Sequence, residues 1–411
     1  MTTRDELYSA AFRYKKTGLW KKLWDNDLFA LKLKSGEIGY ISIMGKNGDY
    51  RALGLYIGDE GIDSWRYIFE NVDKQYESKF REQEIIMQQK CLQMVLDLKD
   101  FLKPEDVKEV RDYAKRNGIR LAGSYTYPQF QKFEPNHQPW NVLDKNDTSM
   151  LYEALEAAIL FADLLKTETL DALGILPVVD DSTHVPLFSV KNGKLKREGM
   201  KVFPERIDRT FKNVVFENEF AIASAKRLRK KDTWEAELIR MVDAMQDDPK
   251  DAPYYPLLLM VVNSNSGIVL PGQVTIDGDE NPEDILSGFL ESAKEMKLFP
   301  KEIRCRDART YALLHDLCEK VGAKIEVSPG PFFALSEAEK AFLNDSLPSD
   351  MEEQEMKEEM FSAIDRILSM NKRELQSMPF EMIQFLRYIA LNSELPDGLG
   401  EKLWNKLDGL H

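Results

Sequence analysis

Residues 29–57 read FALKLKSGEIGYISIMGKNGDYRALGLYI. Within them Phe29–Leu33, Ile38–Met44 and Tyr50–Ile57 alternate apolar with polar residues or run apolar throughout, a pattern that predicts β-strands. The pair Asn47-Gly48 between the second and third of these stretches is typical of a tight hairpin turn. The stretch therefore predicts a meander of three strands.

The segments on both sides extend this meander into an α+β domain. Apolar residues at helical spacing predict a helix over Arg4–Lys16 that ends at Gly18. The chain after the meander predicts, in order, a helix at Ile62–Phe69, a strand at Cys91–Leu98, a helix at Pro104–Arg116 and a strand at Ile119–Ala122. The predicted order is βββαβαβ.

The same order recurs in the second half of the chain. The predicted elements are strands at Trp234–Val242, Tyr255–Val262 and Gly267–Ile276, a helix at Pro282–Met296, a strand at Ile303–Cys305, a helix at Thr310–Val321 and a strand at Ala323–Val327. The two copies share no residue-level identity. We therefore expect two mixed-sheet α+β domains that match in element order and superpose.

Domain boundaries follow from the remaining segments. We predict an N-terminal α+β domain over residues 1–170, a strand-rich and basic connector over 171–232, and a second α+β domain over 233–345. Residues 346–411 form an acidic tail in which Met356, Met360 and Ile364 are spaced as on a helix. The tail is predicted to be a helical packing or interaction module.

Composition restricts the class of protein. The chain has 411 residues, 43% of them hydrophobic, and a formal net charge of −14, which on average repels nucleic acid. No apolar run is long enough for a membrane span, and the first residues do not predict a secretory signal. Three widely spaced cysteines predict buried thiols. We expect a cytoplasmic protein without a membrane partner.

One part of the chain resembles a known fold family. The residues are Trp234-Glu235-Ala236-Glu237, Pro256–Asn263, Ser266–Leu270 and Pro300–Asp307, and they resemble the ribonuclease H-like core of retroviral integrases and transposases. The resemblance covers 234–327, under a quarter of the chain, and implies that both βββαβαβ domains are ribonuclease H-like. With Tyr127–Trp140, the same blocks resemble an uncharacterised bacterial family of unknown function, which implies no activity.

The integrase resemblance implies two candidate catalytic carboxylates. Glu237 stands three residues after Trp234, and Asp307 follows the fourth strand, positions where the family binds two divalent metal ions that activate water. The sequence departs from the family pattern at Asp307-Ala308-Arg309. The third, helical carboxylate of the family has no clear counterpart, and Glu337 and Glu339 are the only nearby acids in the right chain direction. No cofactor is predicted, except Mg²⁺ or Mn²⁺ if the chain is a nuclease.

Two further segments are candidate binding surfaces. The first is an aromatic and proline-rich stretch with Tyr127, Phe130, Phe133, His137 and Trp140, which fits either a surface for a peptide or base, or a seam between domains. The second is a basic run, Lys226, Arg227, Arg229, Lys230 and Lys231. It fits either a nucleic-acid contact or a solvated helix end.

The motifs of phosphate-loop hydrolases, Rossmann dehydrogenases, serine hydrolases and zincin proteases are absent from the sequence. We therefore expect a non-catalytic cytoplasmic interaction or binding protein, with a protein as partner. The alternatives are a divergent metal-dependent nuclease or nucleotidyl-transfer relative, and a nucleic-acid binder that uses residues 191–231. We also expect the acidic run Asp350–Glu359 to fold back and cover the basic run.

Overall fold

The computed structural model describes residues 2–48, 50–76, 78–141, 143–246, 248, 251–270, 274–275 and 281–345, and in the tail 364, 367, 368, 375, 386, 387, 390 and 398–407. The chain divides into two compact units, residues 1–338 and residues 339–411. The first unit is a mixture of helices and two large sheets, so the predicted α+β class is confirmed. Among the described helices, none combines the length and the apolarity that crossing a membrane requires.

The first sheet has seven strands in the order β5-β4-β3-β2-β1-β6-β7. The strands are β1 Phe29–Lys32, β2 Ile38–Met44, β3 Arg51–Ile57, β4 Cys91–Asp97, β5 Tyr127–Phe133, β6 Val185–Lys191 and β7 Lys194–Lys201. The meander β1-β2-β3 is antiparallel, as the hairpin signal indicates. β4 and β5 extend it antiparallel, and β6 pairs with β1 in parallel.

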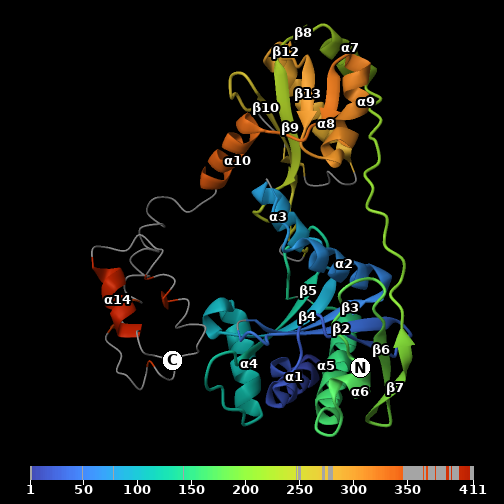
Figure 1. Ribbon diagram of the computed structural model, residues 1–411, viewed down its shortest axis with the longest axis vertical. Coiled ribbons are helices and arrows are strands. Elements are labelled where there is room, and N and C mark those ends of the chain that lie inside the picture. Colours follow the sequence, from blue (N-terminus) through green and yellow to red (C-terminus); the bar gives the residue numbers. More distant parts are fainter. Residues whose placement is uncertain are drawn as a thin grey trace. The chain divides into compact units, whose positions relative to one another are not determined.

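Helices cover both faces of this sheet. They are α1 Arg4–Thr17, α2 Gly58–Asn71, α3 Lys79–Ile86, α4 Pro104–Arg116, α5 Lys145–Leu164 and the short α6 Leu170–Leu173, with 3₁₀ turns at Leu19–Lys21 and Lys99–Phe101. α1 and α5 lie on one face and α2 on the other (Figure 1). α1 begins with a Thr3–Glu6 capping box and ends at Gly18, which adopts the left-handed conformation at φ 61°.

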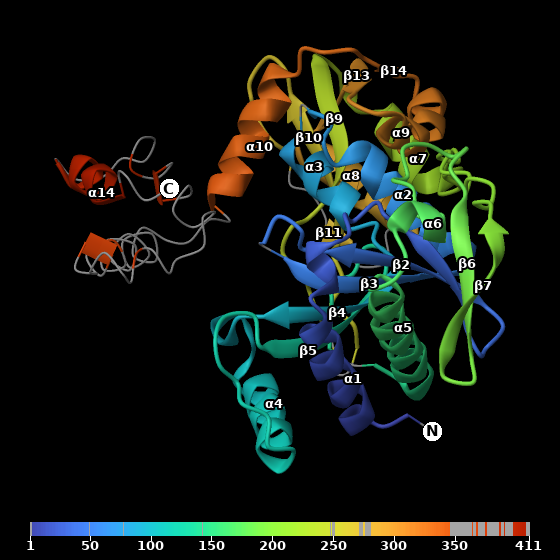
Figure 2. The ribbon, with the colours of Figure 1, turned by 60° about the horizontal axis from the view of Figure 1, so that its bottom comes forward.

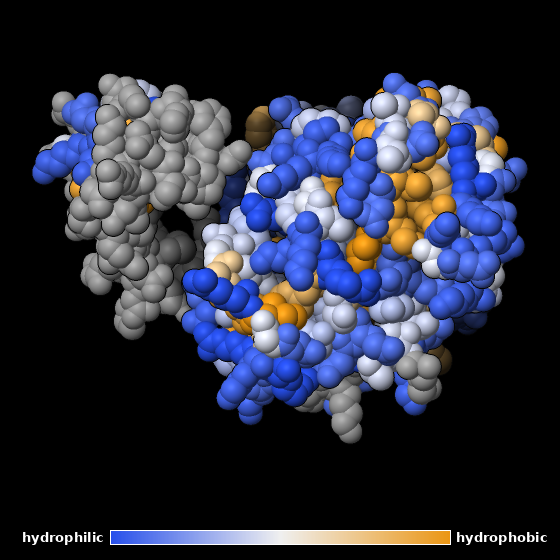
Figure 3. Space-filling view, turned by 90° about the horizontal axis from the view of Figure 1, so that it is seen from below, coloured by the Kyte–Doolittle hydropathy of each residue, from blue (hydrophilic) through white to orange (hydrophobic). Residues whose placement is uncertain are grey.

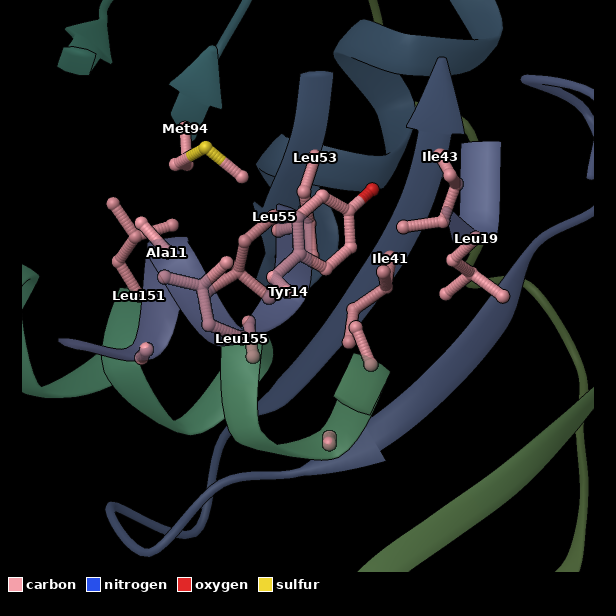
Figure 4. Packing of buried hydrophobic residues seen from close by; sticks show 14 of the residues in the cluster. Ala11, Tyr14, Leu19, Ile41, Ile43, Leu53, Leu55, Met94, Leu151 and Leu155 are labelled. Atoms are coloured by element: carbon pink, nitrogen blue, oxygen red, sulfur yellow. The ribbon is translucent and has the colours of Figure 1, made fainter. Parts of the chain in front are cut away.

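The main core lies between α1, α5 and the meander. Figure 4 shows the side chains of Ala11, Tyr14, Leu151 and Leu155 from the helices directed toward Ile41, Ile43, Leu53 and Leu55 from β2 and β3. These side chains are buried completely. Alternate side chains of the strands point into this core and into the smaller cluster under α2, which contains Tyr40 and Trp65. Both faces of the sheet are therefore buried.

The segment predicted as a connector contributes to this first sheet. β6 and β7 form the hairpin expected at Lys191–Lys194 and lie at the sheet edge (Figure 2). Phe188 of β6 packs its ring against Phe29 and Phe161. Residues 185–201 are therefore part of the N-terminal sheet, because β6 supplies apolar side chains to its core.

The second sheet has five strands in the order β11-β10-β9-β13-β14. The elements are α7 Glu219–Lys226, β8 Arg229–Lys230, β9 Thr233–Arg240, β10 Leu257–Asn263, β11 Val274–Thr275, α8 Pro282–Glu295, β12 Leu298–Phe299, β13 Glu302–Cys305, α9 Ala308–Val321, β14 Lys324–Val327 and α10 Phe333–Asp345. β13 lies parallel to both β9 and β14, while β10 is antiparallel to β9. β8 and β12 form a separate pair.

The two sheets resemble each other in the order of their elements along the chain, but not in how their strands pair. The fourth strand of each copy is a strand, β4 and β13, as predicted. The predicted strand Ile119–Ala122 is wrong, because β5 at Tyr127–Phe133 takes the edge position instead. β4 pairs antiparallel with β3, whereas β13 pairs in parallel with β9. The two sheets therefore do not superpose strand for strand, and a pair of matching domains is not confirmed.

Polar residues make up most of one face of the molecule (Figure 3). The face seen from below is largely hydrophilic, broken by two groups of hydrophobic residues (Figure 3), as on most folded proteins. In the second unit, Ile364, Leu375, Leu386, Leu403 and Leu407 form an apolar cluster, and α14 Leu399–Leu407 carries two of them. The acidic run Asp350–Glu359, and with it the predicted cover over the basic run, lies outside the described residues.

Candidate functional site

Each of the two predicted catalytic carboxylates has a hydrogen-bond partner in the structure. Glu237 lies on β9 and accepts a hydrogen bond at 2.6 Å from Nη1 of Arg306. Both side chains are less than a tenth exposed. Asp307 is the N-cap of α9, where its Oδ1 accepts from the backbone N–H of Thr310 at 2.7 Å. Glu237 therefore neutralises a buried guanidinium, and Asp307 supplies the acceptor oxygen that caps α9.

Glu237 belongs to a row of charges on one face of the sheet. Alternation along β9 places Trp234 and Ala236 in the apolar core and Glu235 and Glu237 on the opposite face. Arg304 lies opposite Glu235 on β13. The start of α10 also contacts this row, because the backbone N–H of Leu335 donates a hydrogen bond to Glu235 at 2.8 Å.

The third carboxylate that the integrase resemblance implies does not complete a metal site. Glu337 and Glu339 lie on α10. Among the residues that the structure describes, there is no group of three or more histidine, cysteine, aspartate or glutamate side chains placed to hold a metal ion. The arginine on Glu237 has the charge that would repel such an ion.

The aromatic stretch lies partly in the core and partly in a seam within the first unit. Tyr127 and Phe130 are buried on β5. Phe133, His137 and Trp140 are half-buried. The backbone beside His137 bonds to the segment that precedes β10, because Gln138 N–H donates to Pro253 and Tyr255 N–H donates to Asn136, both at 2.9 Å. This placement favours the seam over a free binding surface.

The basic run lies at the end of α7 and on the short strand that follows it. Lys226 ends α7, where a cation is favoured by the helix dipole. Arg229 and Lys230 form β8. All five side chains, Lys226, Arg227, Arg229, Lys230 and Lys231, are exposed.

A large cavity was not predicted from the sequence. It is a cleft of about 1010 Å³ within the first unit. Its walls come from α2 and α3, the extended segment 209–215, β9 and β10, and the first turns of α8 and α9. The cleft could not be predicted from the sequence, because its lining residues come from short segments spread over more than 240 positions of the chain.

A buried glutamate organises the arginines of this cleft. Glu84 on α3 is 8% exposed and forms ion pairs with three arginines: Arg81 at 3.1 Å, Arg240 at 4.0 Å and Arg309. Burial alone would raise the pKa of Glu84, but the positive charges of Arg309 and Arg81 lower it below its ordinary value. Glu84 is therefore charged in the folded protein.

A second carboxylate fixes the opposite wall. Asp63 on α2 is buried and accepts a hydrogen bond at 2.7 Å from Nη2 of Arg209. It also forms ion pairs with Arg66 and Arg206. The guanidinium of Arg209 lies over the ring of Tyr67, 4.4 Å from its centre. Arg209 and Tyr67 both line the cleft.

Two family models match the chain. Residues 5–173 match a model described as a domain of unknown function (DUF7309), and residues 222–343 match another described as a domain of unknown function (DUF6930). These matches confirm the expected likeness to families of unknown function. No curated protein and no solved structure matches the chain.

Proposed function

We propose that the chain is a non-catalytic cytoplasmic binding protein in which residues 233–327 form a ribonuclease H-like scaffold. The element order β9, β10, β11, α8, β13, α9, β14 supports that scaffold. One observation carries the absence of catalysis: the Glu237 carboxylate is bound by Arg306 in a buried pair. A metal ion at Glu237 would have to displace a guanidinium, at a cost of several kcal/mol.

Binding is favoured over catalysis by the contrast between the two charged regions. The carboxylates at the expected catalytic positions have arginine or backbone partners. The cleft, in contrast, has more arginine and lysine than carboxylate in its lining. Cavities of this size with a few convergent polar groups are the usual form of ligand sites.

A nuclease assay tests the proposal. The full chain is incubated with single-stranded and duplex DNA and with RNA, in Mg²⁺ and separately in Mn²⁺. We expect no cleavage above that of a matched mock purification. Cleavage by the native chain that disappears in both Glu237→Gln and Asp307→Asn would contradict the proposal and favour the metal-dependent alternative.

Nucleic-acid binding through the basic run is a second candidate, favoured by the exposure of all five of its cations. The same samples can be examined for retention of the uncut duplex. Retention that falls with salt and is lost in Lys230→Gln would support this candidate. Equal mobility with and without the protein at low salt would contradict it.

A further inference from the structure

We propose that the cleft binds a small organic oxyanion, whose phosphate or carboxylate group is held by Arg81 and Arg309. The inference deepens the proposed function, on which it rests, by naming a ligand class for the binding protein. Three observations support it: the excess of positive charge in the cleft, the hydrogen bonds that hold its arginines in place, and the apolar side chains that line the same cleft.

The sign of the charge inside the cleft is opposite to that of the whole chain. Among the residues that the structure describes, its lining contains five cations, Arg81, Arg209, Lys212, Arg240 and Arg309, and three carboxylates, Glu84, Glu283 and Asp284. The formal excess is two positive charges, in a protein whose net charge is −14. Lining of one sign in a partly enclosed space concentrates ions of the other sign. An anion is therefore the favoured occupant.

Glu84 is shared, because its carboxylate forms ion pairs with Arg81, Arg240 and Arg309. Its two oxygens cannot accept from all of the N–H donors of Arg81 and Arg309. Arg309 shows this directly. Its two terminal nitrogens donate to Glu84 and to the Leu238 carbonyl, while its buried Nε has no hydrogen-bond partner among the described residues.

These bonds also hold the guanidinium groups in place before any ligand arrives. Arg309 is 13% exposed and bonded to both β9 and α3. Arg81 is 27% exposed, so part of its guanidinium remains accessible from the cleft. Arginines fixed in this manner lose little side-chain freedom on binding, and their planar donors match the paired oxygens of phosphate or carboxylate.

Apolar side chains beside the arginines favour an organic anion over an inorganic one. Phe211 and Val215, on the extended segment that borders the cleft, are 44% and 55% exposed. Tyr67 contributes a ring that already stacks on Arg209. A cavity of about 1010 Å³ is far larger than one phosphate ion requires. An organic body that covers Phe211 and Val215 would remove this apolar surface from water.

Calorimetric titration of the full chain at low ionic strength, without divalent metal, tests the inference. The probes are phenyl phosphate, benzoate and inorganic phosphate, each against sodium chloride at matched ionic strength. We expect saturable binding of phenyl phosphate, of benzoate or of both, tighter than that of inorganic phosphate. Whichever organic probe binds more tightly identifies the oxyanion that the arginines prefer.

Two variants locate the site. Lys212→Gln and Arg81→Gln each remove one lining cation, and the Lys212 side chain is exposed, so its loss does not endanger folding. Arg81→Gln should raise the dissociation constant of the bound probe about tenfold, because it removes a charge-assisted hydrogen bond to the oxyanion. Lys212→Gln should raise it by less, because it removes only a lining charge. Lys108→Gln, an exposed cation on α4 outside the cleft, is the matched control and should leave the constant unchanged.

Several results would overturn the inference: absence of saturable binding, equal binding of phenyl phosphate and inorganic phosphate, or binding that Lys212→Gln and Arg81→Gln leave intact. These failures are distinct from failure of the proposed function. Catalysis is read from cleavage in Mg²⁺ or Mn²⁺ and depends on Glu237 and Asp307, neither of which lines the cleft. A chain that neither cleaves nor binds these probes would refute the ligand class alone.

Discussion

At the scale of single residues, three buried carboxylates of this chain each pair with one or more arginines. Glu237 is held by Arg306, Asp63 by three arginines and Glu84 by three more. Removing one partner from such a pair leaves an uncompensated buried charge, which costs roughly 3–5 kcal/mol. These residues are therefore expected to respond to substitution more strongly than surface charges do.

Glu84 gives a prediction about pH. Its pKa is below the ordinary 4.5 in the folded protein. Because the carboxyl group is more acidic when folded than when unfolded, its stabilisation is complete above about pH 4.5 and is lost as the pH falls through the folded-state pKa. We expect Glu84→Gln to lower the free energy of unfolding by roughly 3–5 kcal/mol at pH 7. The difference from the native chain should shrink below about pH 4.5.

Urea unfolding at a series of pH values measures this difference. Glu82→Gln is the matched control, since Glu82 lies on the same helix and pairs only with exposed Lys79 among its described ion pairs. It should change the free energy of unfolding by less than about 1 kcal/mol at every pH. A Glu84→Gln effect that stays constant from pH 7 to pH 3.5 would be inconsistent with a shared buried carboxylate.

At the scale of elements, the hydrophobic pattern predicted most helices and strands, because apolar periodicity reflects burial directly. The meander, α4 and the β6–β7 hairpin lie where the sequence placed them. The prediction failed at Ile119–Ala122, which has an apolar composition without a strand partner, while Tyr127–Phe133 pairs with β4 despite its proline. Pro128 is compatible with β5 because β5 is an edge strand. α3 was missed because its pattern is mostly polar.

The pairing of β6 with β1 gives a prediction about where the first sheet ends. The family match stops at residue 173, but β6 pairs with β1 and places Phe188 in the core. A fragment of residues 1–173 would leave the β1 edge unpaired and lose a buried phenylalanine, whose loss by itself costs roughly 3–5 kcal/mol.

We therefore expect a fragment of residues 1–204 to be monomeric and to melt cooperatively. The fragment of residues 1–173 should melt at least about 10 °C lower, or aggregate. Thermal melts followed by circular dichroism, with size-exclusion chromatography, compare the two. Equal melting temperatures and equal elution would show that β6 and β7 are dispensable to the first sheet.

At the scale of the whole molecule, the sequence predicted two sheets and a separate tail, and it missed the cleft. Glu237 and Asp307 could be selected from the spacing after Trp234, but the spacing did not reveal that Arg306 pairs with Glu237. The alternation Arg304-Cys305-Arg306 opposite Glu235-Ala236-Glu237 was the available signal, and it depends on knowing that β13 lies beside β9. The cleft could not be predicted, because several such long-range contacts together bring its lining residues to one place.

Glu237 and Asp307 are proposed to have structural partners and not to bind metal. Calorimetric titration of Mn²⁺ into the metal-free full chain tests it most directly, with Glu237→Gln and Asp307→Asn titrated in parallel. We predict that the native chain and both variants give the same weak, non-saturating heats, because Arg306 and the cap of α9 already occupy the two carboxylates. A saturable Mn²⁺ site in the native chain that is lost in both variants would contradict the account.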